Sequence, residues 1–225
     1  MNFLAMCQRL KREAGLPGGG PVSVSNQTGI HKQIVEWIQS ADEDIQNQHA
    51  DWSFLARDFE FITVEGKQAY SLSDASLADL NHWKTNDYDQ ISCRREYTDE
   101  QFLIPLTWSE FKRVYLFGSS RTISGRPQFF SIKPDKSIVF YPIPDNAYTI
   151  SGEYFIKAKL MTVNSDEPPY PSEYHMAAVW RALMFYGAFD AADERYSHGQ
   201  NEYRRVMNGM YSDQLPTVSW GEPLV

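Results

Sequence analysis

The period of the apolar residues changes twice along this chain of 225 residues, and that change restricts the fold more than any other feature. Near both ends, apolar residues recur every three or four positions, which is the period of an amphipathic helix. Between residues 56 and 160 they often alternate with polar residues, which is the period of a half-buried strand. We therefore expect an α+β fold, in which the N- and C-terminal helices form a helical bundle with an inserted antiparallel β module.

Four segments have helical spacing, and we expect helices at residues 2–13, 28–49, 172–188 and 191–212. Asn26 or Thr28 can cap the second of these helices. The third is apolar nearly all round, so it requires cover on several sides. The expected parts of the chain are helices in residues 1–55, the β-rich module in residues 56–160, helices in residues 161–213 and an extended tail in residues 214–225.

Two hairpins are expected inside the β module. Residues 59–64 and 68–72 flank the turn sequence Glu65-Gly66-Lys67, and the pattern is that of two paired strands. Residues 129–132 and 138–141 flank a second turn, in which Pro134 presets the first central position. Both strand pairs would be antiparallel.

A strand and a short helix complete what the module's pattern indicates. Apolar and polar residues alternate over residues 148–156, which predicts a half-buried strand. Thr107 and Glu110 can satisfy each other's free amide groups in a capping box, which predicts a helix beginning at Trp108 with a packed face of Trp108, Phe111, Val114 and Tyr115. Residues 73–101 have no clear period, so their strands stay unplaced.

The last segment, after residue 213, also has no period but carries apolar side chains. Apolar residues on an extended segment favour docking to another subunit or partner. An alternative is that the tail packs along its own domain or is disordered. The interface candidates are two arginines of the last helix and four apolar residues of the tail: Arg204, Arg205, Leu215, Trp220, Leu224 and Val225.

Patterns that could carry chemistry are incomplete. His198 has Glu194 and Glu202 four residues to either side, but such a line is more typical of exposed charge pairs than of a metal site. Asp87 and Asp89 match a metal-binding spacing that is also common in loops. We therefore predict no catalytic residues, no metal site and no cofactor, and we expect that the protein is not an enzyme.

Two further runs have a plain structural interpretation. The glycine-rich residues 15–21 lack the Lys-Ser/Thr pair of a phosphate-binding loop, so they are interpreted as a flexible connector. Asp42, Glu43 and Asp44 lie inside the second predicted helix, where successive side chains point about 100° apart and cannot converge on one ion. We expect this acidic run to face solvent or a partner.

The formal net charge of −8 argues against a protein that grips DNA, because that affinity comes from Lys and Arg on phosphates. An acidic surface is compatible with a pore through which DNA slides. Cys7 and Cys93 are far apart and are expected to be free thiols. No apolar run reaches membrane-spanning length and no signal peptide pattern is present, so we expect an unprocessed protein made in the cytoplasm, without a membrane partner.

Several short motifs, taken in order, resemble the head-to-tail adaptor (head-tail connector) proteins of tailed bacteriophages. The resemblance extends from about residue 4 to residue 216 and is weak in residues 73–101. Its motifs include Asn26-Gln27-Thr28-Gly29, Asp51-Trp52-Ser53-Phe54-Leu55, Gly125-Arg126-Pro127, Pro142-Ile143-Pro144-Asp145, Tyr203-Arg204-Arg205 and Asp213-Gln214-Leu215-Pro216.

This resemblance implies a structural protein of the virion neck, at the head-tail junction, made in the host cytoplasm. Its copies would form a ring of twelve between the portal protein and the tail or neck proteins. Double-stranded DNA would pass through the lumen without specific binding. Neighbouring copies in a closed ring contact each other through two different surfaces.

Two other functions stay open from the residues alone. A tail-tube or tail-completion protein would share the mixed helix and strand organisation. The aromatic-rich β region could instead form a carbohydrate-binding module, since Trp and Tyr platforms suit sugar rings.

Overall fold

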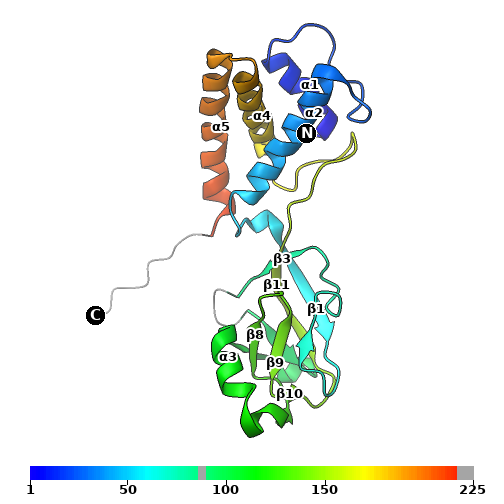
Figure 1. Cartoon of the computed structure of the whole chain (residues 1–225), viewed down its shortest axis with the longest axis vertical. Helices are drawn as coiled ribbons and strands as arrows, with labels where there is room; N and C mark the ends of the chain where they lie inside the picture. Colours follow the sequence, from blue (N-terminus) through cyan, green and yellow to red (C-terminus); the bar gives the residue numbers. More distant parts are fainter. Residues whose placement is uncertain (86–89, 217–225) are drawn as a thin grey trace, which may run out of the picture. The chain divides into compact units, whose positions relative to one another are not determined.

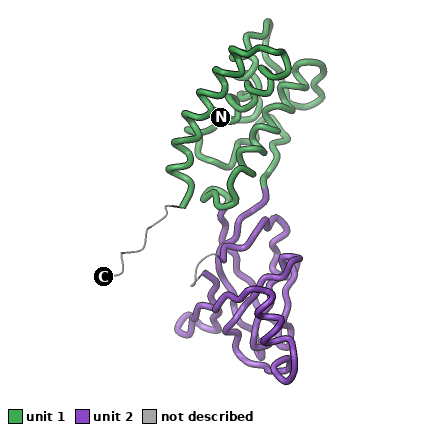
Figure 2. Tube along the Cα trace, turned by 60° about the vertical axis from the view of Figure 1, so that its left-hand side comes forward, with its two compact units in different colours: residues 1–55, 158–225 green, residues 56–157 purple. Residues whose placement is uncertain are grey.

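The computed structural model describes residues 1–85 and 90–216 (Figure 1). The chain divides into two compact units (Figure 2). The helical unit comprises residues 1–55 and 158–225, and the β unit comprises residues 56–157. The mixture of helices and largely antiparallel sheets confirms the predicted α+β class.

Four α-helices form most of the helical unit: α1 (Phe3–Glu13), α2 (Gly29–Asn47), α4 (Met176–Phe189) and α5 (Asp193–Gln214). The Asn2 side chain caps α1 by accepting a hydrogen bond from the Ala5 amide at 2.9 Å. Thr28 is the N-cap of α2, but its side chain makes no capping hydrogen bond. Two short 3₁₀ turns, η1 (Ser53–Leu55) and η4 (Ser172–Tyr174), complete the described secondary structure of this unit.

The central helix of this unit is α4, which packs against α1, α2 and α5. Its apolar side chains point in all directions, and neighbours on three sides bury most of them, as the sequence predicts. It begins at Met176 rather than at the predicted Ser172, because η4 occupies the first three positions.

The helices α4 and α5 approach each other closely at two glycines. A Cβ atom on Gly187 would lie 2.7 Å from the Tyr196 amide nitrogen, and one on Gly199 would lie 3.0 Å from the Trp180 carbonyl oxygen. Both neighbours are backbone atoms, which cannot move aside as a flexible side chain can. The absence of a side chain at these positions therefore allows the helices to pack at this distance.

The β unit contains two main sheets. The five-stranded sheet has the order β1 (Ala56–Ile62), β11 (Thr149–Ile156), β4 (Ser92–Arg94) and β5 (Gln101–Phe102), and β3 (Leu80–Trp83) also pairs with β11. The four-stranded sheet has the order β2 (Ala69–Tyr70), β9 (Ile138–Tyr141), β8 (Phe129–Ile132) and β6 (Ile104–Pro105). A small parallel pair joins β7 (Ser124–Gly125) to β10 (Ile143–Pro144).

The predicted second hairpin is confirmed, and the first is wrong. Strands β8 and β9 pair antiparallel with Ile132 opposite Ile138. Residues 64–67 do form a turn, but the strands on its two sides belong to different sheets: β1 pairs with β11 and β2 pairs with β9. The module is also not wholly antiparallel, because β6 pairs parallel with β8.

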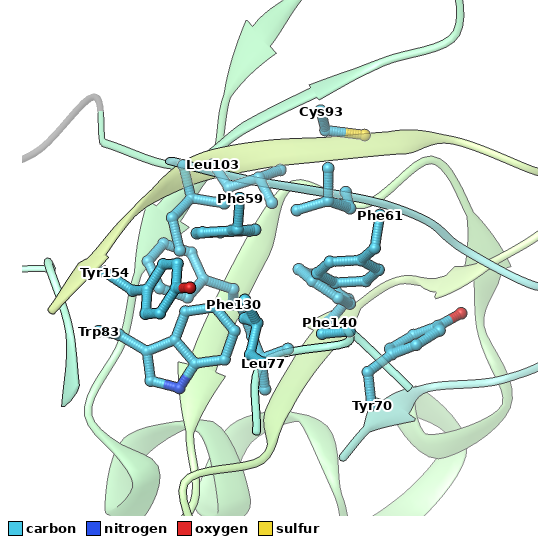
Figure 3. Packing of buried hydrophobic residues seen from close by; sticks show 14 of the residues in the cluster. Phe59, Phe61, Tyr70, Leu77, Trp83, Cys93, Leu103, Phe130, Phe140 and Tyr154 are labelled. Atoms are coloured by element: carbon cyan, nitrogen blue, oxygen red, sulfur yellow. The ribbon is translucent and has the colours of Figure 1, made fainter. Parts of the chain in front are cut away.

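Aromatic side chains fill the space between the two sheets (Figure 3). Phe59 and Phe61 extend from β1, and Phe140 extends from β9 of the other sheet. Phe59 contacts Trp83 edge to face with ring centres 5.0 Å apart, Phe61 and Phe140 are tilted at 6.3 Å, and Phe59 stacks on Phe61 at 6.0 Å. This core holds the two sheets together as one sandwich.

Helix α3 (Trp108–Tyr115) covers the other face of the four-stranded sheet. Ile138 and Phe140 of β9 point into the aromatic core, whereas Val139 and Tyr141 pack with Phe111 of α3. The layers of the β unit are therefore five-stranded sheet, core, four-stranded sheet and α3. Two 3₁₀ helices, η2 (Tyr97–Asp99) and η3 (Gly118–Thr122), lie in its loops.

The capping box predicted for α3 is present. The Thr107 hydroxyl accepts from the Glu110 amide, and the Glu110 carboxylate accepts from the Thr107 amide, both at 3.3 Å. Phe111 is fully buried as predicted, but Val114 is 47% exposed. The predicted packed face is thus wrong at Val114.

Candidate assembly surfaces

The outer face of α5 presents the two arginine candidates to solvent. Arg205 donates two hydrogen bonds to the Glu202 carboxylate, at 2.8 and 3.0 Å. Arg204 is exposed and makes no ion pair with any described residue. The opposite side of α5 is buried through Met207 and Met210. Of the two arginines, Arg204 has the guanidinium that stays available for a partner.

The beginning of the predicted tail is anchored to the helical unit. Gln214, assigned to the tail from the sequence, is the last residue of α5 and accepts a hydrogen bond from the Ser53 hydroxyl at 2.7 Å. Leu215 is half-buried and its amide donates to the Tyr211 carbonyl oxygen. Trp220, Leu224 and Val225 lie outside the described residues.

An aromatic cluster fixes the end of α5 against the end of α2. Tyr211 stacks on Trp52 with a ring separation of 5.8 Å and contacts His49 at 5.3 Å. Trp52 is fully buried, and its indole nitrogen donates to the Ile45 carbonyl oxygen at 3.0 Å. The Gln48 side chain bridges the hydroxyl groups of Tyr211 and Tyr203. The last described residues therefore leave from a rigid base.

A buried polar network lies beside this cluster, and it corrects the expectation that residues 42–44 all face solvent. Asp44 is partly exposed and pairs with Arg181 at 2.9 Å, but Asp42 is 1% exposed. The Asp42 carboxylate accepts from Gln46 at 2.8 Å, and Gln46 also exchanges hydrogen bonds with the backbone of Lys159. The sequence did not reveal that α2 turns Asp42 toward the core.

The environment of Asp42 favours its neutral form. Burial raises the pKa of the Asp42 carboxyl to about 7, although the Tyr170 hydroxyl and Gln46 oppose that rise. Burial also raises the pKa of Tyr170 well above its usual value, and the nearby Asp42 adds to this effect. The two side chains lie close together, yet neither Asp42 Oδ1 nor the Tyr170 hydroxyl has a hydrogen bond of ordinary geometry. A hydrogen bond between Asp42 Oδ1 and the Tyr170 hydroxyl would give each of these buried groups a partner.

The glycine-rich run is tied down by two side chains of α1. Lys11 is buried, and its Nζ donates to the Gly19 carbonyl oxygen at 2.6 Å and lies 3.0 Å from His31 Nε2. Gln8 donates to the Pro21 carbonyl oxygen. The sequence predicted a flexible connector, and the structure adds that two carbonyl oxygens of this run, those of Gly19 and Pro21, accept hydrogen bonds from α1.

His198 and Glu202, which are four residues apart in the sequence, make different contacts in the structure. His198 contacts the Trp180 ring at 5.3 Å edge to face, while Glu202 pairs with Arg205. Within residues 1–85 and 90–216, no three His, Cys, Asp or Glu side chains are grouped as metal ligands. Asp87 and Asp89 lie outside the described residues.

Arg126 has an internal role that the sequence did not reveal. Its guanidinium donates to the Asp99 carboxylate at 3.1 Å, to the Asp99 carbonyl oxygen and to the Cys93 carbonyl oxygen at 2.7 Å. It also lies 5.9 Å from the centre of the Tyr148 ring. The arginine therefore ties the segment before β8 to β4 and η2. Burial raises the pKa of the nearby Cys93 thiol to about 11, and Cys93 is a free thiol as predicted.

The outer face of the five-stranded sheet forms an open groove of about 530 Å³. Its lining is mainly polar and acidic, and Phe102 is 56% exposed there. Eight aromatic side chains of the described β unit pack in the core between the sheets, and Phe59 is the one of these eight that also lines this groove. The residues that line it are Asp58, Phe59, Glu60, Lys84, Gln90, Ser92, Phe102, Ser151, Gly152 and Glu153.

The described ranges contain no helix with both the length and the apolar character needed to cross a membrane. What they present instead is an α+β protein with anchored helix ends, exposed charges and an open groove. The exposed charges and the groove are surfaces on which a partner can dock.

The sequence matches the family model described as SU10 adaptor protein over residues 1–223. The chain belongs to this family of phage head-tail adaptors, as its motifs predicted. The family is structural and is not a class of enzymes. No curated protein matches the sequence.

Proposed function

We propose that the protein is a head-to-tail adaptor that forms a ring, of twelve copies, between the portal protein and the tail or neck proteins. The observation that carries this proposal is the family match over nearly the whole chain. Such a ring lies in the neck of the virion, and double-stranded DNA passes through its lumen without specific binding. In each subunit, the helices from both ends of the chain form a bundle, and residues 56–157 form the inserted module.

The base of the tail supports a docking role for residues 217–225. The aromatic cluster of Trp52 and Tyr211 holds the end of α5, and the Ser53–Gln214 hydrogen bond holds its last turn. A segment that leaves a rigid base loses less conformational freedom on docking than one attached to a mobile base. Trp220 and Leu224 would then supply the buried anchors of the contact.

Deleting residues 217–225 is expected to weaken association with the portal by at least about a hundredfold, since a buried aromatic anchor alone contributes about 2 kcal/mol or more. This truncation keeps Gln214 and its contact with Ser53, so the fold is preserved. The measurement is co-sedimentation of the full chain and the truncated chain with purified portal. In the full chain, Trp220→Ala should reproduce most of the loss, and Thr217→Ala should have little effect. Unchanged co-assembly of the truncated chain would remove the tail from the mechanism.

The acidic balance of the chain supports passage of DNA without binding. Each subunit has a net charge of −8, so the total negative charge of a ring is several times larger. A negatively charged inner surface of the ring repels the phosphates of DNA. We expect a density map of the assembled neck to show the ring below the portal, with a neutral to acidic inner wall. A strongly basic wall would contradict the passive lumen, and labelled protein along the whole tail would instead favour a tail-tube role.

A further inference from the structure

One surface of the β unit is basic and apolar, in a protein that is acidic as a whole. Residues 111–134 contain five Lys or Arg residues and no Asp or Glu. Two of these cations have internal contacts: Arg126 binds Asp99, and Lys133 lies 5.8 Å from the Trp108 ring centre. The others remain exposed on α3 and η3. We call this the α3 surface, formed by Lys112, Arg113, Phe117, Arg121 and Ile123.

Exposed apolar side chains lie among these cations. Phe117 is 62% exposed, Val114 is 47% exposed and Ile123 is 46% exposed. Large apolar side chains beside charged ones are typical of surfaces that a partner covers. Lys112 and Arg121 make no ion pair with any described residue, so their charges are available to such a partner.

The groove on the five-stranded sheet has the opposite charge. Asp58 of β1 lies directly across from Glu153 of β11, and like charges in that position repel each other. Lys84 pairs with Glu153, and Arg94 pairs with Glu60 at 2.5 Å and with Glu100 at 3.4 Å. Four carboxylates and two cations leave a net charge of −2 on this surface, which we call the acidic face.

The acidic face also carries apolar side chains and a free charge. Ile62 follows Glu60 on the outer side of β1 and is 64% exposed, and Phe102 lines the groove. Asp58 has no ion pair within the described residues. A cation supplied from outside would relieve the repulsion between Asp58 and Glu153.

The two surfaces lie on opposite sides of the β unit. The order of layers is acidic face, five-stranded sheet, aromatic core, four-stranded sheet and α3. Contacts between copies in a closed ring require two different surfaces on each copy, matched to each other. The α3 surface and the acidic face meet this requirement in sign of charge, in apolar content and in placement.

We propose that the α3 surface of one copy binds the acidic face of the next copy, so that neighbouring β units contact each other head to tail. Lys112 and Arg121 would lie against Asp58 and its neighbouring carboxylates, while Phe117 and Ile123 would contact Ile62 and Phe102. The inference rests on the proposed ring and names a contact within it. Bound DNA could explain the α3 surface alone but not the acidic groove, so a second copy is the occupant that accounts for both.

The test is self-association of the full chain, measured by sedimentation over a range of concentration and salt. The double variant Lys112→Glu/Arg121→Glu and the single variant Asp58→Lys are each expected to lower the association constant at least about tenfold. Combining the three substitutions in one chain places a cation on the acidic face against carboxylates on the α3 surface and should recover association. Mixing the two separate variants should do the same, through alternating copies. The variant Arg12→Glu/Lys32→Glu, with the same charge change on the helical unit, should associate like the wild type.

Three results would overturn this inference. They are a wild type that stays monomeric at the highest concentration reached, charge reversals without effect, and reversals that no complementary change rescues. Retention on a DNA column that is lost in Lys112→Glu/Arg121→Glu while self-association is unchanged would assign the α3 surface to DNA instead. Association of the full chain with the portal is measured separately, and this distinguishes the two proposals. If the chain self-associates in a charge-dependent way but does not bind the portal, only the adaptor role is rejected.

Discussion

The Asp42→Asn variant is expected to be more stable than the wild type at pH 8, by roughly 4 kcal/mol, and nearly equal to it at pH 4. Burial raises the pKa of Asp42 to about 7 in the folded protein, whereas the same carboxyl titrates near pH 4 in an unfolded chain. Asn stays neutral at every pH. It can still accept the hydrogen bond from Gln46 and can donate one to the Tyr170 hydroxyl.

The sign of this effect follows from proton binding. Between about pH 4 and pH 7 the folded protein holds a proton on Asp42 that the unfolded chain releases. The contribution of Asp42 to stability is therefore complete below about pH 4, falls as the pH rises to about 7 and stays constant above that. Urea unfolding at several pH values, followed by helical circular dichroism, measures it.

Two comparisons isolate the contribution of Asp42. His175 also titrates in this range, and burial lowers its pKa, so its contribution to stability changes with the opposite sign. The contribution of His175 to the free energy of unfolding is the same in variant and wild type, so it cancels in the difference between them. Glu43→Gln, an exposed neighbour on the same helix, should shift stability by less than about 0.5 kcal/mol at any pH. A destabilised Asp42→Asn at pH 8 would show that the carboxylate is needed in its charged form.

The second large effect is expected at the contact between α4 and α5. Gly187→Ala should lower the free energy of unfolding by about 1–3 kcal/mol, because the new methyl group would lie within 3 Å of the Tyr196 backbone. The link between the helices is only a few residues long, so α5 cannot shift without disturbing its contacts with α4. Thermal and urea unfolding of the full chain measure the loss.

Gly209→Ala is the matched control. Gly209 is an exposed residue inside α5, and a methyl group there would meet only the Tyr174 ring, at an ordinary 3.5 Å. The exchange should stabilise the protein by about 0.5–1 kcal/mol, because alanine favours the helix. Equal effects of the two substitutions would show that the close approach at Gly187 carries no energetic weight.

The parts of the fold that depend on neighbours in the sequence could be predicted well. The Thr107–Glu110 capping box and the hairpin of β8 and β9 are formed within a few residues, and their signals lie within those residues. The four long helices were found for the same reason, with ends displaced by a few residues. All the residues that determine such an element are close together in the sequence, so the sequence is sufficient to predict it.

Pairings over long distances could not be predicted. The turn at residues 64–67 exists, but β1 pairs with β11, almost a hundred residues away, and no feature of the turn indicates this choice. Asp42 was expected to face solvent or a partner together with Glu43 and Asp44, but side chains 100° apart on a helix can face different ways, and of the three only Asp42 is buried. Its burial depends on Tyr170 and Lys159, which the folded chain brings from far along the sequence.

The interface candidates show the same limit. Arginines and apolar tail residues could be chosen by type, but the structure shows that Arg205 already has a partner and that Gln214 still belongs to α5. The α3 surface was missed, although the sequence carried a signal for it in the basic run without acids. Its meaning depends on the acidic face on the opposite side of the module, which only the folded layers reveal.

The first and last strands of the β unit are hydrogen-bonded neighbours, with Ala56 opposite Phe155. The chain therefore enters and leaves this unit at points roughly 5 Å apart. A segment with adjacent ends can be exchanged as a whole, because its removal only shortens one loop of the helical unit. Recombination among phages can thus replace residues 56–157 in one step and change the proteins that this unit binds, while the helical unit is inherited unchanged.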